Sequence, residues 1–191
     1  MKSLPTLIGE NIWLGDFVFN QWFYEKYHSW LHHPQIEPFI GPVSEESPEK
    51  VKKMLIENKL DEKIKHWCVY FGPYYDKKSP IGDGSLNLLD SQSEFAELDN
   101  SYFNFKKSEE FTILIGEGRG KGIGTEATSL ILNQAFSTGT DAVYLGVYTN
   151  NFGGIKVYER NGFQTIGTAI DKESKKEELI MRITSQNWRL R

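Results

Sequence analysis

Apolar and polar positions follow two periods along the chain, one typical of strands and the other of helices. Short, mostly apolar runs bounded by glycine, proline or charged residues predict strands. These runs are residues 6–14, 66–72, 80–90, 109–116, 141–149, 162–170 and 177–185. The last two flank a charged turn and predict a closing hairpin. We therefore expect a sheet of about seven strands.

Helices are predicted between these strands. They span residues 17–31, 48–60 and 123–136, and a short one carries Ile155, Val157 and Tyr158. Pro34 prevents the first helix from continuing. Ser47 as N-cap and Pro48 at the first helical position mark the start of the second.

Strands that alternate with helices and finish in a hairpin are typical of the α/β (α+β) class with a mixed sheet and flanking helices. No repeat and no Pro- or Ser-rich linker divides the chain, so residues 1–191 are expected to form one domain. Residues 91–108 show no clear period. They predict either a loop or a short extra strand around Tyr102–Phe105.

Composition and charge restrict the possible partners and the cellular compartment of the protein. The chain has 191 residues, 39% of them hydrophobic, and a formal net charge of -4. A mildly acidic chain has no global electrostatic reason to bind nucleic acid or an anionic membrane. No window approaches the roughly 18 apolar residues that a membrane helix needs, and the single Cys68 fits a reducing compartment. We expect a cytoplasmic protein with no nucleic-acid or membrane partner.

The most informative segment is a glycine-rich turn between a predicted strand and a predicted helix, residues 116–125. Glycines let successive backbone N–H groups point into one concavity, and the helix N-terminus adds positive potential. Arg119 and Lys121 add charge, and the Thr125 hydroxyl can donate a further hydrogen bond. The segment predicts a phosphate or pyrophosphate site. The alternative is a tight, basic, solvated turn without a ligand.

The type of nucleotide is restricted by the neighbouring residues. A Walker loop needs Ser or Thr after its lysine, but Gly122 follows Lys121. A dinucleotide fingerprint fits Gly122–Ala127 loosely, yet the next strand ends in Thr149-Asn150-Asn151 without the acidic residue that would bind a ribose. A dinucleotide-dependent oxidoreductase is therefore the weaker alternative.

Arg119-Gly-Lys-Gly122-Ile-Gly124 resembles the (Q/R)-x-x-G-x-(G/A) acetyl-CoA motif of the GNAT N-acetyltransferase superfamily. Residues 147–163 resemble the second family signature, V-x-x-x-N-x-x-A-x-x-x-Y-x-x-x-G-F. Residues 110–116 are similar to the E-x-x-I-x-I-G strand of the Rim-type (RimJ/RimL-like) branch. The resemblance covers residues 80–185.

The chain departs from the family pattern at three places. Gly154 replaces the usual alanine, which loosens the helix but keeps the site small. Only Glu117 and Gly118 separate Gly116 from Arg119, a shorter link than in the branch. Residues 91–108 form a longer connection than usual, in a region that borders the acceptor in such enzymes.

The resemblance implies a GNAT fold in which the strands before and after the cofactor helix splay apart and hold acetyl-CoA as cosubstrate. Exposed backbone of Ile113, Leu114 and Ile115 would pair with the pantetheine arm and polarise the thioester carbonyl. The implied cofactor-binding residues are Ile113, Leu114, Ile115, Arg119, Gly120, Lys121, Gly122, Ile123, Gly124, Thr125, Asn151 and Tyr158. Asn151, Ile155 and Tyr158 are expected on one helical face.

Catalysis by direct attack of an amine needs two proton transfers. By analogy Tyr158 is the acid that protonates the leaving thiolate, and Glu110 is the base that accepts the proton of the ammonium, directly or through water. The alternatives are a core aromatic for Tyr158, a helix cap for Asn151, and for Glu110 an exposed glutamate paired with Lys106 or Lys107. Glu109 is a weaker candidate base.

The resemblance leaves the acceptor open among a protein N-terminus, an aminoglycoside, a polyamine and an amino sugar. It also leaves open a non-catalytic module that binds CoA. A homodimer is compatible with it, because dimers are frequent in this family.

Other chemically suggestive residues have simpler explanations. His28 and His32 are four residues apart but lack an acidic third ligand, so we expect no metal site. Cys68 lies in a predicted strand and is expected to be a small core residue. The acidic residues at 94, 97 and 99 predict a solvated loop, with attraction of a cationic acceptor as the alternative.

Overall fold

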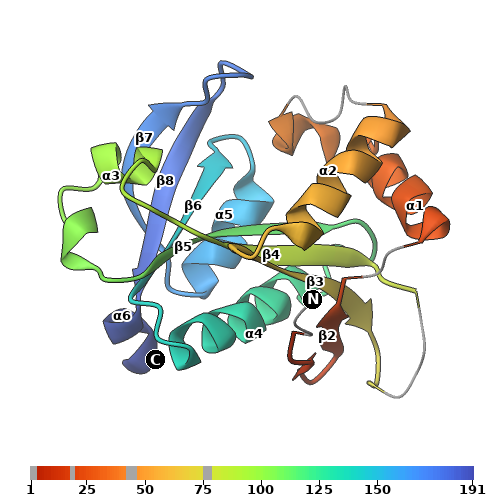
Figure 1. Cartoon of the computed structure of the whole chain (residues 1–191), viewed down its shortest axis with the longest axis horizontal. Coiled ribbons are helices and arrows are strands. Elements are labelled where there is room, and N and C mark those ends of the chain that lie inside the picture. Colours follow the sequence, from red (N-terminus) through yellow and green to blue (C-terminus); the bar gives the residue numbers. More distant parts are fainter. Residues whose placement is uncertain (1–3, 18–19, 42–46, 75–78) are drawn as a thin grey trace.

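The computed structural model describes residues 4–17, 20–41, 47–74 and 79–191. Within these ranges eight strands form one open sheet in the order β1-β2-β3-β4-β5-β6-β8-β7 (Figure 1). They are β1 (Leu7–Ile8), β2 (Ile12–Asp16), β3 (Ile64–Phe71), β4 (Gly82–Leu88), β5 (Ser108–Ile115), β6 (Ala142–Tyr148), β7 (Gln164–Ile170) and β8 (Glu177–Thr184). The mixed sheet is confirmed, because only β5 and β6 run parallel. It has one strand more than expected, since residues 6–14 hold two strands joined by a turn.

Helices cover both faces of this sheet. They are α1 (Gln21–Leu31), α2 (Pro48–Leu60), α3 (Glu94–Leu98), α4 (Ile123–Ser137), α5 (Phe152–Arg160) and α6 (Ser185–Arg189), with 3₁₀ turns η1 (Glu37–Phe39) and η3 (Tyr102–Asn104). α1 and α2 pack on one face, over Cys68 and Tyr70 of β3, whereas α4 packs on the other face with Trp67 and Val69 (Figure 1). In the described part of the chain no helix is both long and apolar enough to cross a bilayer.

Capping side chains set where the first two helices begin. The Ser47 hydroxyl accepts a hydrogen bond from the Lys50 amide at 3.3 Å, which confirms the predicted start of α2. α1 begins later than expected, because the Asn20 side chain accepts from the Phe23 amide at 2.8 Å and so caps the helix at that point.

Residues 91–108 hold two short helical segments, α3 and η3, joined by turns, so the extra strand is wrong and the loop has more regular structure than expected. Asp99 is 8% exposed, so the solvated-loop interpretation fails for this residue. Its carboxylate accepts hydrogen bonds from the Tyr144 hydroxyl at 2.7 Å and from the Arg182 guanidinium at 2.6 Å. These buried bonds fasten the segment to β6 and β8.

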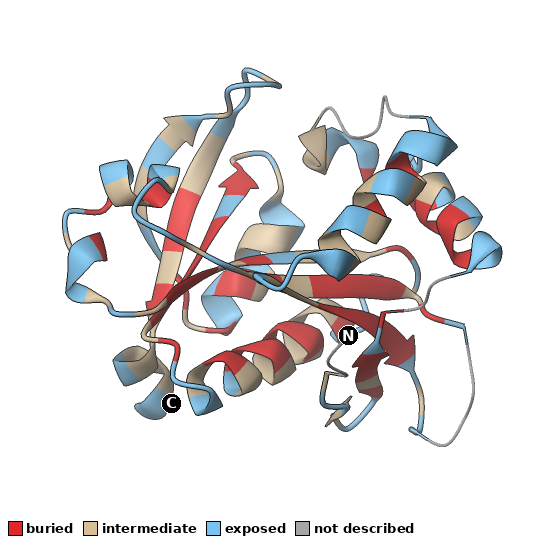
Figure 2. Ribbon diagram, in the orientation of Figure 1, coloured by how far each residue is buried: buried red, intermediate tan, exposed pale blue. Residues whose placement is uncertain are grey.

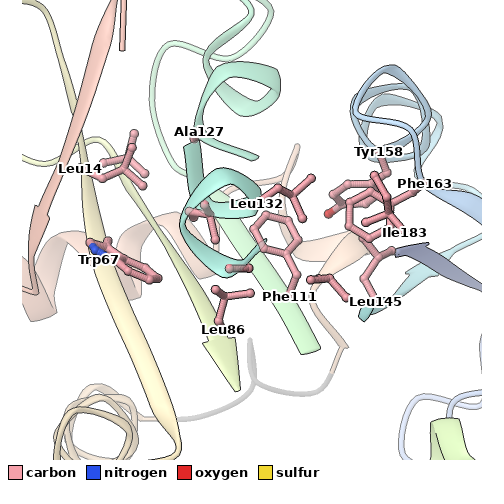
Figure 3. Packing of buried hydrophobic residues seen from close by; sticks show 14 of the residues in the cluster. Leu14, Trp67, Leu86, Phe111, Ala127, Leu132, Leu145, Tyr158, Phe163 and Ile183 are labelled. Carbon is pink, nitrogen blue, oxygen red and sulfur yellow. The ribbon is translucent and has the colours of Figure 1, made fainter. Parts of the chain in front are cut away.

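The main core lies between the sheet and α4 (Figure 2). Figure 3 shows Ala127 and Leu132 of α4 in the middle of this cluster, with Leu14 and Trp67 at one end and Tyr158 at the other. Because Tyr158 is part of this packing, the core fixes the position of α5 relative to the parallel strands.

Candidate functional site

Strands β5 and β6 separate part-way along their length. Their parallel pairing is limited to Ser108↔Ala142, Glu109↔Val143 and Glu110↔Tyr144. Beyond Glu110, β5 stays paired with β4 on its other side as far as Ile115. The two strands therefore splay, as the sequence resemblance implied, and leave one edge of β5 without a neighbouring strand.

Alternation along β5 decides which backbone groups face this gap. The amide of Gly116 donates to Ile81 just before β4, and the amide of Asp141 just before β6 donates to Lys107. Even-numbered residues of β5 therefore direct their backbone toward β4, and odd-numbered ones direct it toward β6. Of the three residues predicted to offer backbone groups, Ile113 and Ile115 direct theirs into the gap. Leu114 directs its backbone groups toward Asp83 on β4.

The glycine-rich turn leads from the open end of β5 into α4. Gly118, Gly120 and Gly122 have φ values of 69°, 81° and 81°, a left-handed conformation that L side chains rarely adopt. A Cβ at Gly120 or Gly122 would meet nothing within 4 Å, so conformation rather than crowding calls for glycine there. Gly122 is the N-cap of α4 and offers no capping side chain. The first amides of α4 are thus available to an anion.

The two basic residues of the turn point to different places. Arg119 lines the cavity beside the turn, and its guanidinium donates to Gln35 Oε1 at 3.0 Å and to the Gly116 carbonyl at 3.3 Å. Lys121 does not line this cavity. Its Nζ lies 5.7 Å from the centroid of the Phe71 ring. Arg119 is therefore the better placed of the two for an anionic ligand.

A cavity of about 1010 Å³ runs from the turn along the open edge of β5. Of the predicted cofactor residues it is lined by Ile113, Leu114, Ile115, Arg119, Gly120, Gly122, Ile123, Gly124, Thr125, Asn151 and Tyr158. Its other walls come from α1, α2, η1, β4, β6, α5 and β8. Tyr27 and Leu31 contribute from α1.

Helix α5 presents its residues differently from the prediction. Asn151 caps the helix, because its side chain accepts from the Gly154 amide at 2.9 Å. Ile155 packs against the core instead of lining the cavity, and Gly154 and Val157 line it in its place. A Cβ at Gly154 would lie 2.8 Å from the Asn151 side chain, so glycine there accommodates the cap.

Tyr158 reaches the cavity from within the core. The residue is 9% exposed, and its ring packs edge-on against Phe111 and Phe163. Burial raises the pKa of Tyr158 to about 12. The phenol therefore keeps its proton throughout the neutral range, as a proton donor must.

Glu110 lies where the parallel strands part, and it lines both the main cavity and a second cavity of about 520 Å³. Burial, followed by the charges of Glu94 and Glu178, raises the pKa of Glu110. Glu109 points elsewhere. It is buried, and it accepts from Lys65 Nζ and the Thr140 hydroxyl, both at 2.6 Å. Glu110 is thus the glutamate that faces the open space.

The comparisons with known proteins agree with this geometry. The family profile described as "Acetyltransferase (GNAT) domain" matches residues 23–164. The chain belongs to this family. A curated relative, the N-acetyltransferase 9-like protein of Caenorhabditis briggsae, is 31% identical over 114 residues, which are 59% of this chain and 54% of the relative. The chain therefore matches about half the length of that relative.

Solved structures share the GNAT fold at low sequence identity. The aminoglycoside acetyltransferase AAC(6')-Ib in complex with coenzyme A has a TM-score of 0.71 at 16% identity, covering 94% of this chain and 98% of that one. A chimera of the spermidine N-acetyltransferase SpeG from Vibrio cholerae and hSSAT has a TM-score of 0.72 at 18% identity, covering 95% and 100%. An uncharacterised protein from Bacillus halodurans has a TM-score of 0.75 at 17% identity, covering 94% and 86%.

The residues present fit acetyl-CoA, which GNAT acetyltransferases use as their acetyl donor. The uncapped N-terminus of α4 suits a diphosphate, and the unpaired edge at Ile113 and Ile115 suits the amides of a pantetheine arm. The cavity volume is in the range of cofactor sites.

Several lining residues escaped prediction from sequence. Lys156 and Arg160 line the cavity from α5, and Asp83, Asp171 and Glu178 add carboxylates from β4 and from the β7–β8 hairpin. None of them lies in the glycine turn or at a fixed position of the second signature. Only the fold brings these residues to the cavity.

The remaining candidates have local roles. His28 and His32 have ring centroids 4.1 Å apart, and the described residues include no group of three potential metal ligands. Cys68 is fully buried in the core over α1 and α2, as predicted.

Proposed function

We propose that this chain is an acetyl-CoA-dependent N-acetyltransferase that acetylates a primary amine by direct attack. The observation that carries the proposal is the end of β5–β6 pairing at Glu110 and Tyr144. It leaves a cavity with two distinct ends, an anion site at the N-terminus of α4 and a carboxylate at the opening between the strands.

Each part of the cavity has a role in this chemistry. Acetyl-CoA, when bound, supplies an activated acetyl group as a thioester. The amides of residues 118–124 and the Arg119 guanidinium bind its diphosphate, and the Ile113 backbone orients the reacting carbonyl. Glu110 accepts the proton that the ammonium of the acceptor must lose before attack. Tyr158 donates its phenolic proton to the departing thiolate.

Charge favours a cationic acceptor. Four carboxylates line the cavity, Asp83, Glu110, Asp171 and Glu178, and they outnumber its three basic residues, Arg119, Lys156 and Arg160. Burial, followed by the charges of Glu94 and Asp171, raises the pKa of Glu178. Carboxylates that disfavour one another's charge gain from a cationic ligand. Among the alternatives, this supports a polyamine or an aminoglycoside over a weakly charged acceptor. The names of two structural neighbours, an aminoglycoside and a spermidine acetyltransferase, point the same way.

Turnover tests the proposal. Purified protein is mixed with acetyl-CoA and a panel of amines, and release of thiol is followed together with the mass of the acetylated product. We expect both to appear with polyamines or aminoglycosides. A protein that binds CoA yet releases no thiol with any amine would be a non-catalytic CoA-binding module. Stabilisation by NAD instead of CoA would favour the oxidoreductase alternative.

The finer assignments are part of the same proposal. Membership of the Rim-type branch rests on the resemblance within residues 80–185. Residues 1–191 are proposed to act as one domain, and a homodimer remains compatible with this activity.

A further inference from the structure

A buried histidine–aspartate pair lies on the sheet face that α1 and α2 cover. His66 on β3 and Asp83 on β4 are 4% and 6% exposed. His66 Nε2 donates to Asp83 Oδ2 at 2.5 Å, and the His66 ring stacks on Phe17 with centroids 4.0 Å apart. The roles assigned above to Glu110 and Tyr158 do not use this pair.

Each member of the pair has one polar atom without a partner. His66 Nδ1 and Asp83 Oδ1 are buried and form no hydrogen bond with any described residue. An unpaired buried carboxylate oxygen is costly, so such an atom points to a missing donor. Asp83 lines the main cavity, whereas His66 lies behind it. A ligand in the cavity can therefore supply the missing donor to Asp83.

Strand register gives the distance from Asp83 to the proposed catalytic base. Asp83 is opposite Leu114, and Asn87 is opposite Glu110, so the two acidic residues are four positions apart on adjacent strands. At roughly 3.4 Å per residue and 4.8 Å between strands, their Cα atoms are about 14 Å apart. Four positions preserve the side-chain alternation, so both residues face the same side of the sheet.

We propose that Asp83, held in place by His66, binds a second ammonium group of the acceptor while the first reacts beside Glu110. The inference rests on the proposed function and makes it more specific, because it assigns a long diamine or polyamine as the acceptor class. Asp83 is then a specificity-determining residue and His66 a positioning residue. Burial, followed by the charge of Asp83, raises the pKa of the neighbouring Tyr27, and a hydrogen bond with Asp83 contributes as well. The Tyr27 phenol therefore stays neutral and leaves the negative charge of Asp83 uncompensated on the cavity side.

The wild-type protein allows a first test without any variant. Diaminopropane, diaminohexane and diaminooctane are compared as acceptors with monoamines of the same chain length. We expect kcat/KM to favour the longest diamine over its monoamine by about tenfold, and the shortest pair to show no preference. Equal rates for all diamines and monoamines would overturn the inference while leaving the acetyltransferase proposal intact. If no amine is acetylated, the proposed function and this inference both fail.

Variants then locate the effect. Asp83→Asn is expected to bring the long-diamine preference close to one, with monoamine kcat/KM within about twofold of wild type. Asp16→Asn, the same change at an exposed carboxylate that lines neither cavity, is the matched control and keeps the preference. His66→Leu should lower the preference, and His66→Gln, which retains an N–H donor, should restore it. A preference that survives Asp83→Asn would contradict the assignment.

Calorimetry separates the acceptor from the donor as the source of the N–H group. If Asp83 bound an amide of the pantetheine arm, Asp83→Asn would raise the Kd for CoA and leave the diamine preference unchanged. We expect the opposite result, with an unchanged Kd for CoA. Should Asp83→Asn fail to fold, the wild-type diamine series decides the question alone.

Discussion

Glu110 and Tyr144 form the last bridge between the parallel strands β5 and β6. On the β5 side of this bridge the strand continues to Ile115 without a partner on one edge, and on the β6 side the chain continues to Tyr148 and into α5. One position thus sets both the opening of the cavity and the location of its best-placed carboxylate.

Tyr158→Phe is expected to lower kcat by about a hundredfold, the lower end of what a general acid contributes. The Kd for CoA should stay unchanged, because the ring and its contacts with Phe111 and Phe163 remain. Single-turnover kinetics and calorimetry measure the two quantities. A variant with wild-type kcat would remove Tyr158 as the acid.

The pH dependence of Tyr158 follows from its burial. Because its pKa is about 12, the acid stays protonated through the neutral and mildly alkaline range. The alkaline decline of kcat caused by loss of this proton should therefore lie above the usual tyrosine value of about 10. A pH–rate profile in which the phenol titrates below that value would contradict the stated environment.

Glu110→Gln is expected to lower activity and to raise stability. Its pKa is raised in the folded protein, so the charged form that acts as base costs folding free energy at neutral pH. The protonated carboxyl of Glu110 therefore favours the folded state at low pH, and this stabilisation is lost as the pH rises through the raised pKa. We expect an increase in Tm at pH 7 and a loss of the acidic limb of the kcat/KM profile. A lower Tm, or an unchanged acidic limb, would argue against Glu110 as base.

Arg119→Glu and Lys121→Glu form a matched pair of charge reversals, two positions apart. Only Arg119 lines the cavity, whereas the ammonium of Lys121 lies over Phe71. We expect the Kd for CoA to rise at least about tenfold for Arg119→Glu and less than about threefold for Lys121→Glu. Equal effects would indicate that the turn acts only through its net charge.

Asp99→Asn tests what fastens residues 91–108 to the sheet. Burial alone would raise the pKa of Asp99, but hydrogen bonds from Tyr144, Ser101 and Arg182 outweigh burial and lower it to about 2. Removing the charge should cost about 2 kcal/mol in the free energy of unfolding, measured in urea.

The sign of the acid response of Asp99 follows from the lowered pKa. The stabilisation is complete above the unfolded value of 3.8 and is lost as the pH falls from about 4 to about 2. Wild-type protein should lose stability in this window, and Asp99→Asn should show a smaller loss. Parallel acid titrations of the two proteins would contradict this account.

Structural features that depend on a few neighbouring residues could be predicted from the sequence. Ser47 and Pro48 mark the start of α2, and the glycines at 118, 120 and 122 mark a turn with left-handed conformations. Both depend on local backbone requirements, which a short segment carries in full. The strand periods likewise predicted seven of the eight strands.

Structural features that depend on residues distant in the sequence could not be predicted from it. Asp99 looked like part of a solvated loop, because Tyr144 and Arg182 are far away in the sequence. The same holds for Asp83, whose partner His66 sits on the neighbouring strand. Lys121 lies over the ring of Phe71, which is also distant in the sequence. Burial and partners of these side chains come from the assembled fold.

Amide NMR during a titration with CoA tests the central claim most directly. The account predicts saturable shifts of the amide signals of Gly120, Gly122 and Gly124 at the N-terminus of α4, together with those of Ile113 and Ile115 on the open edge of β5, and no such shifts with NAD. Unshifted signals at these residues, or CoA-dependent shifts confined to another part of the protein, would contradict it.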